Sequence, residues 1–162
     1  MANNLLPRIN FNDSHKYLQR ISSKLENQRV VVISGSAGSG KTPLANEFAY
    51  KLQEEDKVWR SFMIFSESEH QIETALRKIS VLMQLDLNNK EIYNDLLNHI
   101  KTRMQNLPFS FLIIFDDLVE YNHIEPILQK LLPLNKIKFL VTTRTENIFR
   151  QSTHNPYILN IS

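Results

Sequence analysis

The sequence predicts an α/β fold in which a parallel β-sheet carries helices on both of its faces. Short apolar segments without polar alternation recur along the chain, which is typical of strands buried on both faces of such a sheet. Between them lie segments with apolar residues three and four positions apart, as expected of crossover helices. The length of 162 residues suits one domain of this kind.

Five strands and, after the lead-in segment, four helices are expected, of which the last is the shortest. The strands cover residues 30–34, 58–65, 109–115, 138–142 and 157–161. The helices cover residues 41–54, 69–85, 90–105 and 125–132, with a helical turn near Asn147. We expect residues 1–29 to form an N-terminal lead-in segment with a helix, and residues 30–162 to form the rest of the domain.

The helix that begins at Lys41 is predicted to be amphipathic. Its apolar side carries Leu44, Ala45, Phe48, Ala49 and Leu52. Its polar side carries Asn46, Glu47, Lys51 and Glu54. Trp59 and the phenylalanines are expected in the core, and the five histidines are expected on the surface.

The composition is that of a folded globular protein. Apolar residues make up 42% of the chain, and 19 basic against 17 acidic side chains give a net charge of +2. This near balance gives no electrostatic indication of nucleic acid binding. The polar N-terminus does not read as a signal peptide, and no apolar run reaches the length of a membrane span. We therefore expect a cytoplasmic protein without a membrane partner.

All three glycines of the chain lie between the first strand and the helix after it. The stretch consists of Gly35, Ser36, Ala37, Gly38, Ser39, Gly40, Lys41 and Thr42. It matches the P-loop pattern G-x-x-x-x-G-K-[ST], in which backbone N–H groups and a helix N-terminus together bind phosphate. We expect residues 35–42 to bind ATP or ADP, with Lys41 bridging the β- and γ-phosphates and the Thr42 hydroxyl ligating Mg²⁺.

Pro43 departs from a common P-loop feature. The residue at this position usually donates a backbone N–H to the α-phosphate, and proline has none, although it fits the first turn of a helix. Weaker nucleotide binding is expected, by about 0.5–1.5 kcal/mol, the net worth of one hydrogen bond.

Two acids follow the apolar strand that ends at Phe115. An acid at the carboxyl end of a parallel strand faces the crevice where ligands bind, so Asp116 is the expected Mg²⁺ residue. Asp117 could orient or deprotonate an attacking water, but it is one methylene shorter than the glutamate that many active ATPases place there. Farther along, Arg144 follows Thr142 and Thr143 at the end of a strand, where it either contacts the γ-phosphate or lies in solvent.

Three stretches, ISGSAGSGKTPLANEFAYKL, FLIIFDDL and KFLVTTRTENIF, together resemble the NB-ARC family of the signal transduction ATPases with numerous domains. The resemblance covers about residues 5–160. It implies a three-layer P-loop NTPase fold with a five-stranded parallel sheet, in which the strand before Arg144 lies between the P-loop strand and the Asp116 strand. It also implies that Asp117 is the acidic successor of the metal-binding Asp116, and that Arg144 senses the γ-phosphate.

The sequence also departs from the family. Asp13 and Ser14 stand where the family usually carries a Gly-Arg pair near the adenine pocket. The chain has no counterpart of the family's helical ARC subdomain or winged-helix domain, so it is not expected to run the family's nucleotide switch alone.

Three functions are compatible with these observations. The first is a Mg²⁺-dependent ATP- or ADP-binding signalling module with slow or no hydrolysis, which acts through a protein partner or self-association. The second is an active P-loop ATPase, oligomeric or associated with DNA, to which Arg144, Arg150 or Arg103 could contribute in trans. The third is a nucleotide-independent binding module left by truncation of a longer gene.

Overall fold

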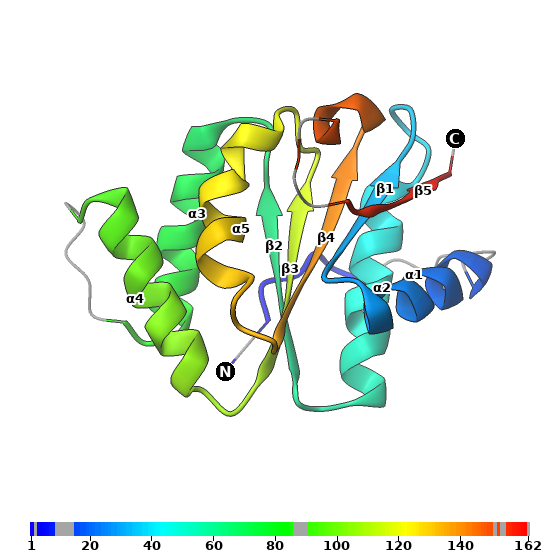
Figure 1. Ribbon diagram of the computed structural model, residues 1–162. Coiled ribbons are helices and arrows are strands. Elements are labelled where there is room, and N and C mark those ends of the chain that lie inside the picture. Colours follow the sequence, from blue (N-terminus) through cyan, green and yellow to red (C-terminus); the bar gives the residue numbers. More distant parts are fainter. Residues whose placement is uncertain (2, 9–14, 86–90, 151, 153–154, 162) are drawn as a thin grey trace.

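The computed structural model contains a five-stranded, all-parallel sheet between two layers of helices (Figure 1). It describes residues 1, 3–8, 15–85, 91–150, 152 and 155–161. The strands are β1 (Val30–Ser34), β2 (Trp59–Phe65), β3 (Ser110–Asp116), β4 (Ile137–Thr143) and β5 (Tyr157–Asn160). The helices are α1 (His15–Asn27), α2 (Lys41–Glu55), α3 (Glu69–Leu82), α4 (Tyr93–Asn106) and α5 (Glu125–Leu131), with 3₁₀ turns η1 (Tyr121–His123) and η2 (Glu146–Phe149).

The strand order is β2-β3-β4-β1-β5. Strand β4 therefore lies between β1 and β3, which confirms the α/β fold and the order implied by the resemblance. Because all strands are parallel, their carboxyl ends meet at one edge of the sheet, the upper edge in Figure 1. The P-loop, Asp116 and Arg144 all follow strand ends at this edge.

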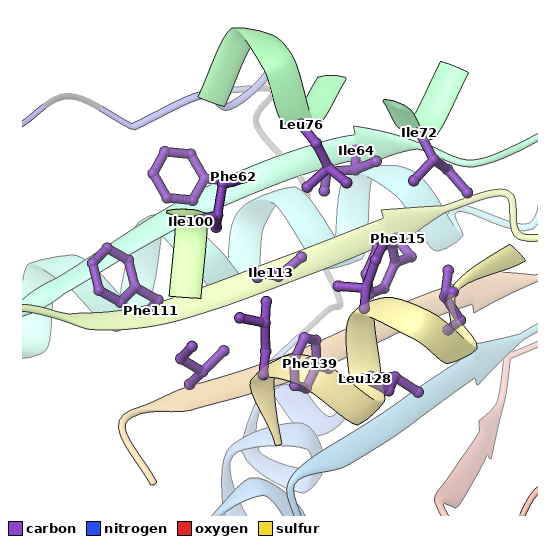
Figure 2. Close-up of a cluster of buried hydrophobic side chains, with 14 of the residues drawn as sticks. Phe62, Ile64, Ile72, Leu76, Ile100, Phe111, Ile113, Phe115, Leu128 and Phe139 are labelled. Carbon is purple, nitrogen blue, oxygen red and sulfur yellow. The ribbon is translucent and has the colours of Figure 1, made fainter. Parts of the chain in front are cut away.

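Each face of the sheet is covered by its own helices. Side chains of α1 and α2 pack on one face, against residues such as Val31 and Leu140. Side chains of α3, α4 and α5 pack on the other face (Figure 2), where Phe62 stacks near Phe111 and Phe115 near Phe139. Burying each of these rings stabilises the fold by about 1.5–3 kcal/mol. The core thus fixes the strands whose ends carry the candidate site.

The predicted boundaries hold to within a few residues. Helix α3 ends at Leu82 rather than at residue 85, because Gln84 takes a left-handed backbone with φ of 60°. The N–H groups of Gln84 and Leu85 then cap the carbonyls of Val81 and Ser80. The predicted start of the following helix, at residue 90, lies outside the described residues.

Asn46 and Glu47, on the predicted polar side of α2, are nevertheless buried. Their exposed fractions are 4% and 8%, because residues 3–8 pack over this side of the helix. Asn46 accepts a hydrogen bond from the N–H of Leu6 at 3.1 Å and donates one to its carbonyl at 3.1 Å. Arg8 pairs with Glu47 at 2.7 Å. Helical periodicity cannot reveal a segment that returns from the N-terminus.

Asn4 joins the same N-terminal segment to the edge of the sheet. Its N–H donates to the carbonyl of Ser61 at 3.1 Å, and its carbonyl accepts from the N–H of Met63 at 2.8 Å. Residues 3–8 thus connect the edge strand β2 with α2, the helix that begins at the P-loop.

The histidine prediction needs one correction. His15, His70 and His99 are exposed as expected, whereas His123 is only partly exposed and its Nδ1 atom is buried without a partner among the described residues. His154, and the adenine-pocket positions at Phe11, Asp13 and Ser14, lie outside the described residues. Trp59 is partly buried and packs against the core on the α1–α2 face. No helix in the described part of the chain is both long and apolar enough to cross a membrane.

Candidate functional site

Glycine is required by the geometry of the loop between β1 and α2. Gly38 and Gly40 have φ of 79° and 94°, a left-handed region that residues with a Cβ rarely adopt. A Cβ on Gly35 would lie 2.5 Å from the Ser39 hydroxyl, well inside contact distance. The N–H of Gly35 donates to the carbonyl of Thr143 at 3.2 Å, so the loop begins against the end of β4.

Lys41 folds back over this loop. Its ammonium donates to the carbonyl of Ser36 at 2.8 Å, and the residue is only 5% exposed. A buried ammonium with one neutral acceptor leaves two N–H donors for an anion. The Ser39 hydroxyl is also buried and has no partner among the described residues. Phosphate oxygens would supply acceptors to both groups, so the loop fits an anionic ligand.

Asp116 receives two hydroxyl groups on one oxygen. Thr42 Oγ1 donates to Asp116 Oδ1 at 2.7 Å, and Thr142 Oγ1 donates to the same atom at 2.8 Å. Burial raises the pKa of Asp116, and the hydrogen bonds from Thr42 and Thr142 oppose that rise. Asp117 adds a smaller increase to the pKa, and Lys41 a smaller decrease.

The oxygens of Thr42 and Asp116 could hold Mg²⁺. No cluster of three His, Cys, Asp or Glu side chains suited to a metal ion occurs in the described residues. Mg²⁺ does not need such a cage, because it usually binds one or two carboxylates together with phosphate oxygens and water. A hydroxyl and a carboxylate beside a phosphate-binding loop are a donor set of this kind. A cation there would also offset the cost of ionising the buried carboxylate.

Asp117 and Arg144 lie close enough to attract each other. Asp117 Oδ1 is 3.8 Å from Arg144 Nε, and the arginine side chain is 63% exposed. The backbone of Asp117 is left-handed with φ of 57°, and its N–H donates to Thr142 Oγ1 at 2.8 Å. Both residues line a cavity of about 230 Å³, together with Glu67 and Thr143.

The structure thus brings the candidates predicted from the sequence together in two groups. In the first group, the hydrogen bond of Thr42 joins the loop at residues 35–42 to Asp116. In the second group, Asp117, which follows β3, lies near Arg144, which follows β4. Pro43 lies in the first turn of α2, where the first backbone bond runs from the N–H of Leu44 to the carbonyl of Gly40 at 3.0 Å.

Sequence reasoning missed two supporting contacts. The Thr142 hydroxyl donates to the Asp116 side chain and accepts from the backbone N–H of Asp117. The Thr-Thr-Arg pattern located Thr142 at a strand end but did not indicate these two contacts. Glu146 accepts hydrogen bonds from Ser34 Oγ at 3.0 Å and from Asn160 Nδ2 at 2.8 Å. Through Glu146 the turn after Arg144 is connected to the ends of β1 and β5.

Comparison with solved structures finds a similar fold in several proteins. Cdc6p from Pyrobaculum aerophilum matches 96% of this chain and 47% of its own at 13% identity and a TM-score of 0.71. A second similar structure is that of a signal transduction ATPase with numerous domains and a tetratricopeptide repeat sensor, from Pyrococcus horikoshii. The match covers 96% of this chain and 24% of that protein, at 22% identity and a TM-score of 0.56. The match to the DnaC helicase loader covers 98% of this chain and 96% of the loader, at 18% identity and a TM-score of 0.55.

At these identities the likeness concerns the fold, and the chain spans less than half of the first two proteins. No curated protein sequence matches the chain. The sequence profile of the NB-ARC domain, by contrast, matches residues 12–161, which is almost the whole chain. The matched region contains the glycine loop, both aspartates and Arg144. The chain therefore belongs to the NB-ARC family.

Proposed function

We propose that this chain is a Mg²⁺-dependent ATP- or ADP-binding regulatory module that hydrolyses ATP slowly or not at all. The hydrogen bond between Thr42 and Asp116 carries the proposal, because it places two oxygen ligands for a cation beside a phosphate-binding loop. Family membership and fold support nucleotide binding in general. The choice of adenine rests on the family.

Each part of the loop has a role in this proposal. The backbone N–H groups of residues 35–42 bind the phosphates, and Lys41 exchanges the Ser36 carbonyl for phosphate oxygens. Thr42 and Asp116 hold Mg²⁺, which when bound neutralises part of the phosphate charge.

Two features support slow turnover. Pro43 removes one N–H from the phosphate cradle. The carboxylate of Asp117 lies 3.8 Å from Arg144 Nε, so this acid is directed toward the guanidinium rather than toward an attacking water. A γ-phosphate would compete with Asp117 for Arg144, which gives the protein a way to distinguish ATP from ADP.

The second candidate function is an active ATPase. It is favoured by the cavity that Asp117 and Arg144 share, because a base candidate and a cation there lie near the expected position of the γ-phosphate. The partner of the regulatory module would be a protein or a second copy of the chain, and the proposal does not specify which.

Thermal unfolding with Mg²⁺-ADP, Mg²⁺-ATP and Mg²⁺-GTP tests the proposal. At 100 times its dissociation constant, a nucleotide should stabilise the wild type by about 2.7 kcal/mol. Lys41→Ala should lose this gain, whereas the exposed Lys51→Ala on the same helix should keep it. If nucleotide stabilises the wild type no more than Lys41→Ala, the result would favour the nucleotide-independent module. Steady turnover of roughly 10 s⁻¹, typical of enzymes, would favour the active ATPase.

A further inference from the structure

Glu67 lines the same cavity as Asp117 and Arg144. It lies two residues after β2, which ends at Phe65, and next to Ser66, whose backbone is bonded to the candidate metal residue Asp116. The N–H of Ser66 donates to the carbonyl of Asp116 at 2.7 Å, so Glu67 leaves the sheet beside the ends of β3 and β4. A third strand thus contributes a charged side chain to this part of the site.

The backbone around Glu67 is held on both sides. Its own N–H donates to Gln71 Oε1 at 3.0 Å, and the N–H of Gln71 donates to Ser68 Oγ, the N-cap of α3, at 3.2 Å. On the other side, the buried Ser66 hydroxyl donates to the carbonyl of Ile64 at 2.8 Å. Glu67 therefore sits in a fixed turn between a core strand and a capped helix.

The two acids of the cavity differ in their electrostatic surroundings. Asp117 lies 3.8 Å from the Arg144 guanidinium, whereas Glu67 has no ion pair with any described residue. The pairing directs the Asp117 carboxylate toward Arg144, whereas no such partner holds the Glu67 carboxylate away from a water in the cavity. Glutamate is also one methylene longer than aspartate, and neighbouring strands are only about 4.8 Å apart. A glutamate at the end of β2 can reach the space in front of β3.

We propose that Glu67, rather than Asp117, is the general base for whatever ATP hydrolysis the chain performs. Its carboxylate accepts a proton from the attacking water, whose oxygen forms a bond to the γ-phosphorus. The bond between the γ-phosphorus and the β–γ bridging oxygen breaks, and the electron pair stays on ADP. Inorganic phosphate leaves, and Glu67 returns its proton to solvent. This assignment rests on the proposed nucleotide binding.

The test compares Glu67→Gln with Asp117→Asn in the full chain. Single-turnover release of phosphate gives the rate, and titration with Mg²⁺-ATP gives the dissociation constant. Glu67→Gln should lower the rate by about 100-fold or more, the usual contribution of a general base, and leave the dissociation constant within about two-fold. Asp117→Asn should lower the rate less. The exposed Glu69→Gln, two residues along, is the matched control and should change neither quantity.

Chemical rescue separates a base from a structural role. Formate should restore part of the rate to Glu67→Ala and none to Asp117→Ala, because a small carboxylate replaces a proton acceptor but not a packing contact. A wild-type rate in Glu67→Gln would overturn the assignment, as would a wild type that binds ATP without any turnover. A wild type that binds no nucleotide would overturn the proposed function and this assignment with it.

Discussion

Thr42 and Asp116 are 74 residues apart in sequence, and a hydrogen bond of 2.7 Å joins their side chains. This bond connects the first turn of α2 to the end of β3 across the mouth of the phosphate-binding loop. The same carboxylate oxygen also accepts the Thr142 hydroxyl at 2.8 Å. The protein thus holds a buried carboxyl group whose pKa burial raises, and a bound cation would offset the cost of ionising it.

Asp116→Asn should make the ligand-free protein more stable at pH 7. Burial raises the pKa of Asp116 above its unfolded value, so the stability that this group contributes at low pH is lost as pH rises through the folded pKa. Asparagine has no charge to desolvate, and its carbonyl can still accept from Thr42 and Thr142. Thermal unfolding without nucleotide should show a midpoint a few degrees higher than that of the wild type.

The same variant should lose the Mg²⁺-dependent part of nucleotide stabilisation, measured as the difference between scans with Mg²⁺ and with a chelator. The gain in the ligand-free protein should shrink below about pH 4, where the unfolded aspartate is itself protonated. A variant less stable than the wild type at pH 7 would show that the two hydroxyls outweigh burial.

Pro43→Thr should tighten nucleotide binding. The substitution restores a backbone N–H in the first turn of α2, where the phosphates are expected to lie. One hydrogen bond is worth about 0.5–1.5 kcal/mol, which corresponds to a dissociation constant about 2- to 12-fold lower. Calorimetric titration with Mg²⁺-ADP measures this change, and an unaltered dissociation constant would contradict the expected α-phosphate contact.

Local patterns were sufficient for the elements and for the glycine loop. The strand at residues 30–34 has the predicted bounds, and α3 begins at the predicted Glu69, because β-branched runs and helical spacing depend on neighbouring residues. The strand order came from family resemblance, since each strand in a parallel sheet is equally compatible with several neighbours. The resemblance likewise favoured a γ-phosphate contact for Arg144, whose position alone also fits an ordinary solvated arginine.

Contacts between distant segments could not be predicted in this way. Asn46 and Glu47 have the spacing of exposed residues, yet the segment at residues 3–8 buries them. Glu67 carries no motif at all. Its place beside Asp117 follows only from the pairing of β2 with β3, which brings the turns after the two strands together.

Asn46→Ala should destabilise the fold without touching the phosphate loop. It removes the acceptor of the Leu6 N–H and the donor to the Leu6 carbonyl, both at 3.1 Å. The carbonyl keeps the hydrogen bond from the Tyr50 hydroxyl at 2.8 Å, but the part-buried Leu6 N–H is left without an acceptor, which costs about 1–3 kcal/mol in the free energy of unfolding. Urea denaturation measures the loss, and the exposed Asn94→Ala on α4 should stay within about 0.5 kcal/mol of the wild type. Equal effects of the two variants would mean that the N-terminal segment does not hold α2.

Tyr93 should titrate above the ordinary pKa of a tyrosine side chain. Burial raises its pKa to about 12, and the charges of Glu73 and then Glu69 add to the increase. Because the folded state holds this proton more tightly than the unfolded state, whose tyrosines titrate near pH 10, stability should fall as pH rises between about 10 and 12. Tyrosinate absorbance should show a step near pH 12 that Tyr93→Phe removes. A difference curve with its midpoint near pH 10 would place Tyr93 in solvent, and the loss of stability in this range would then belong to other groups.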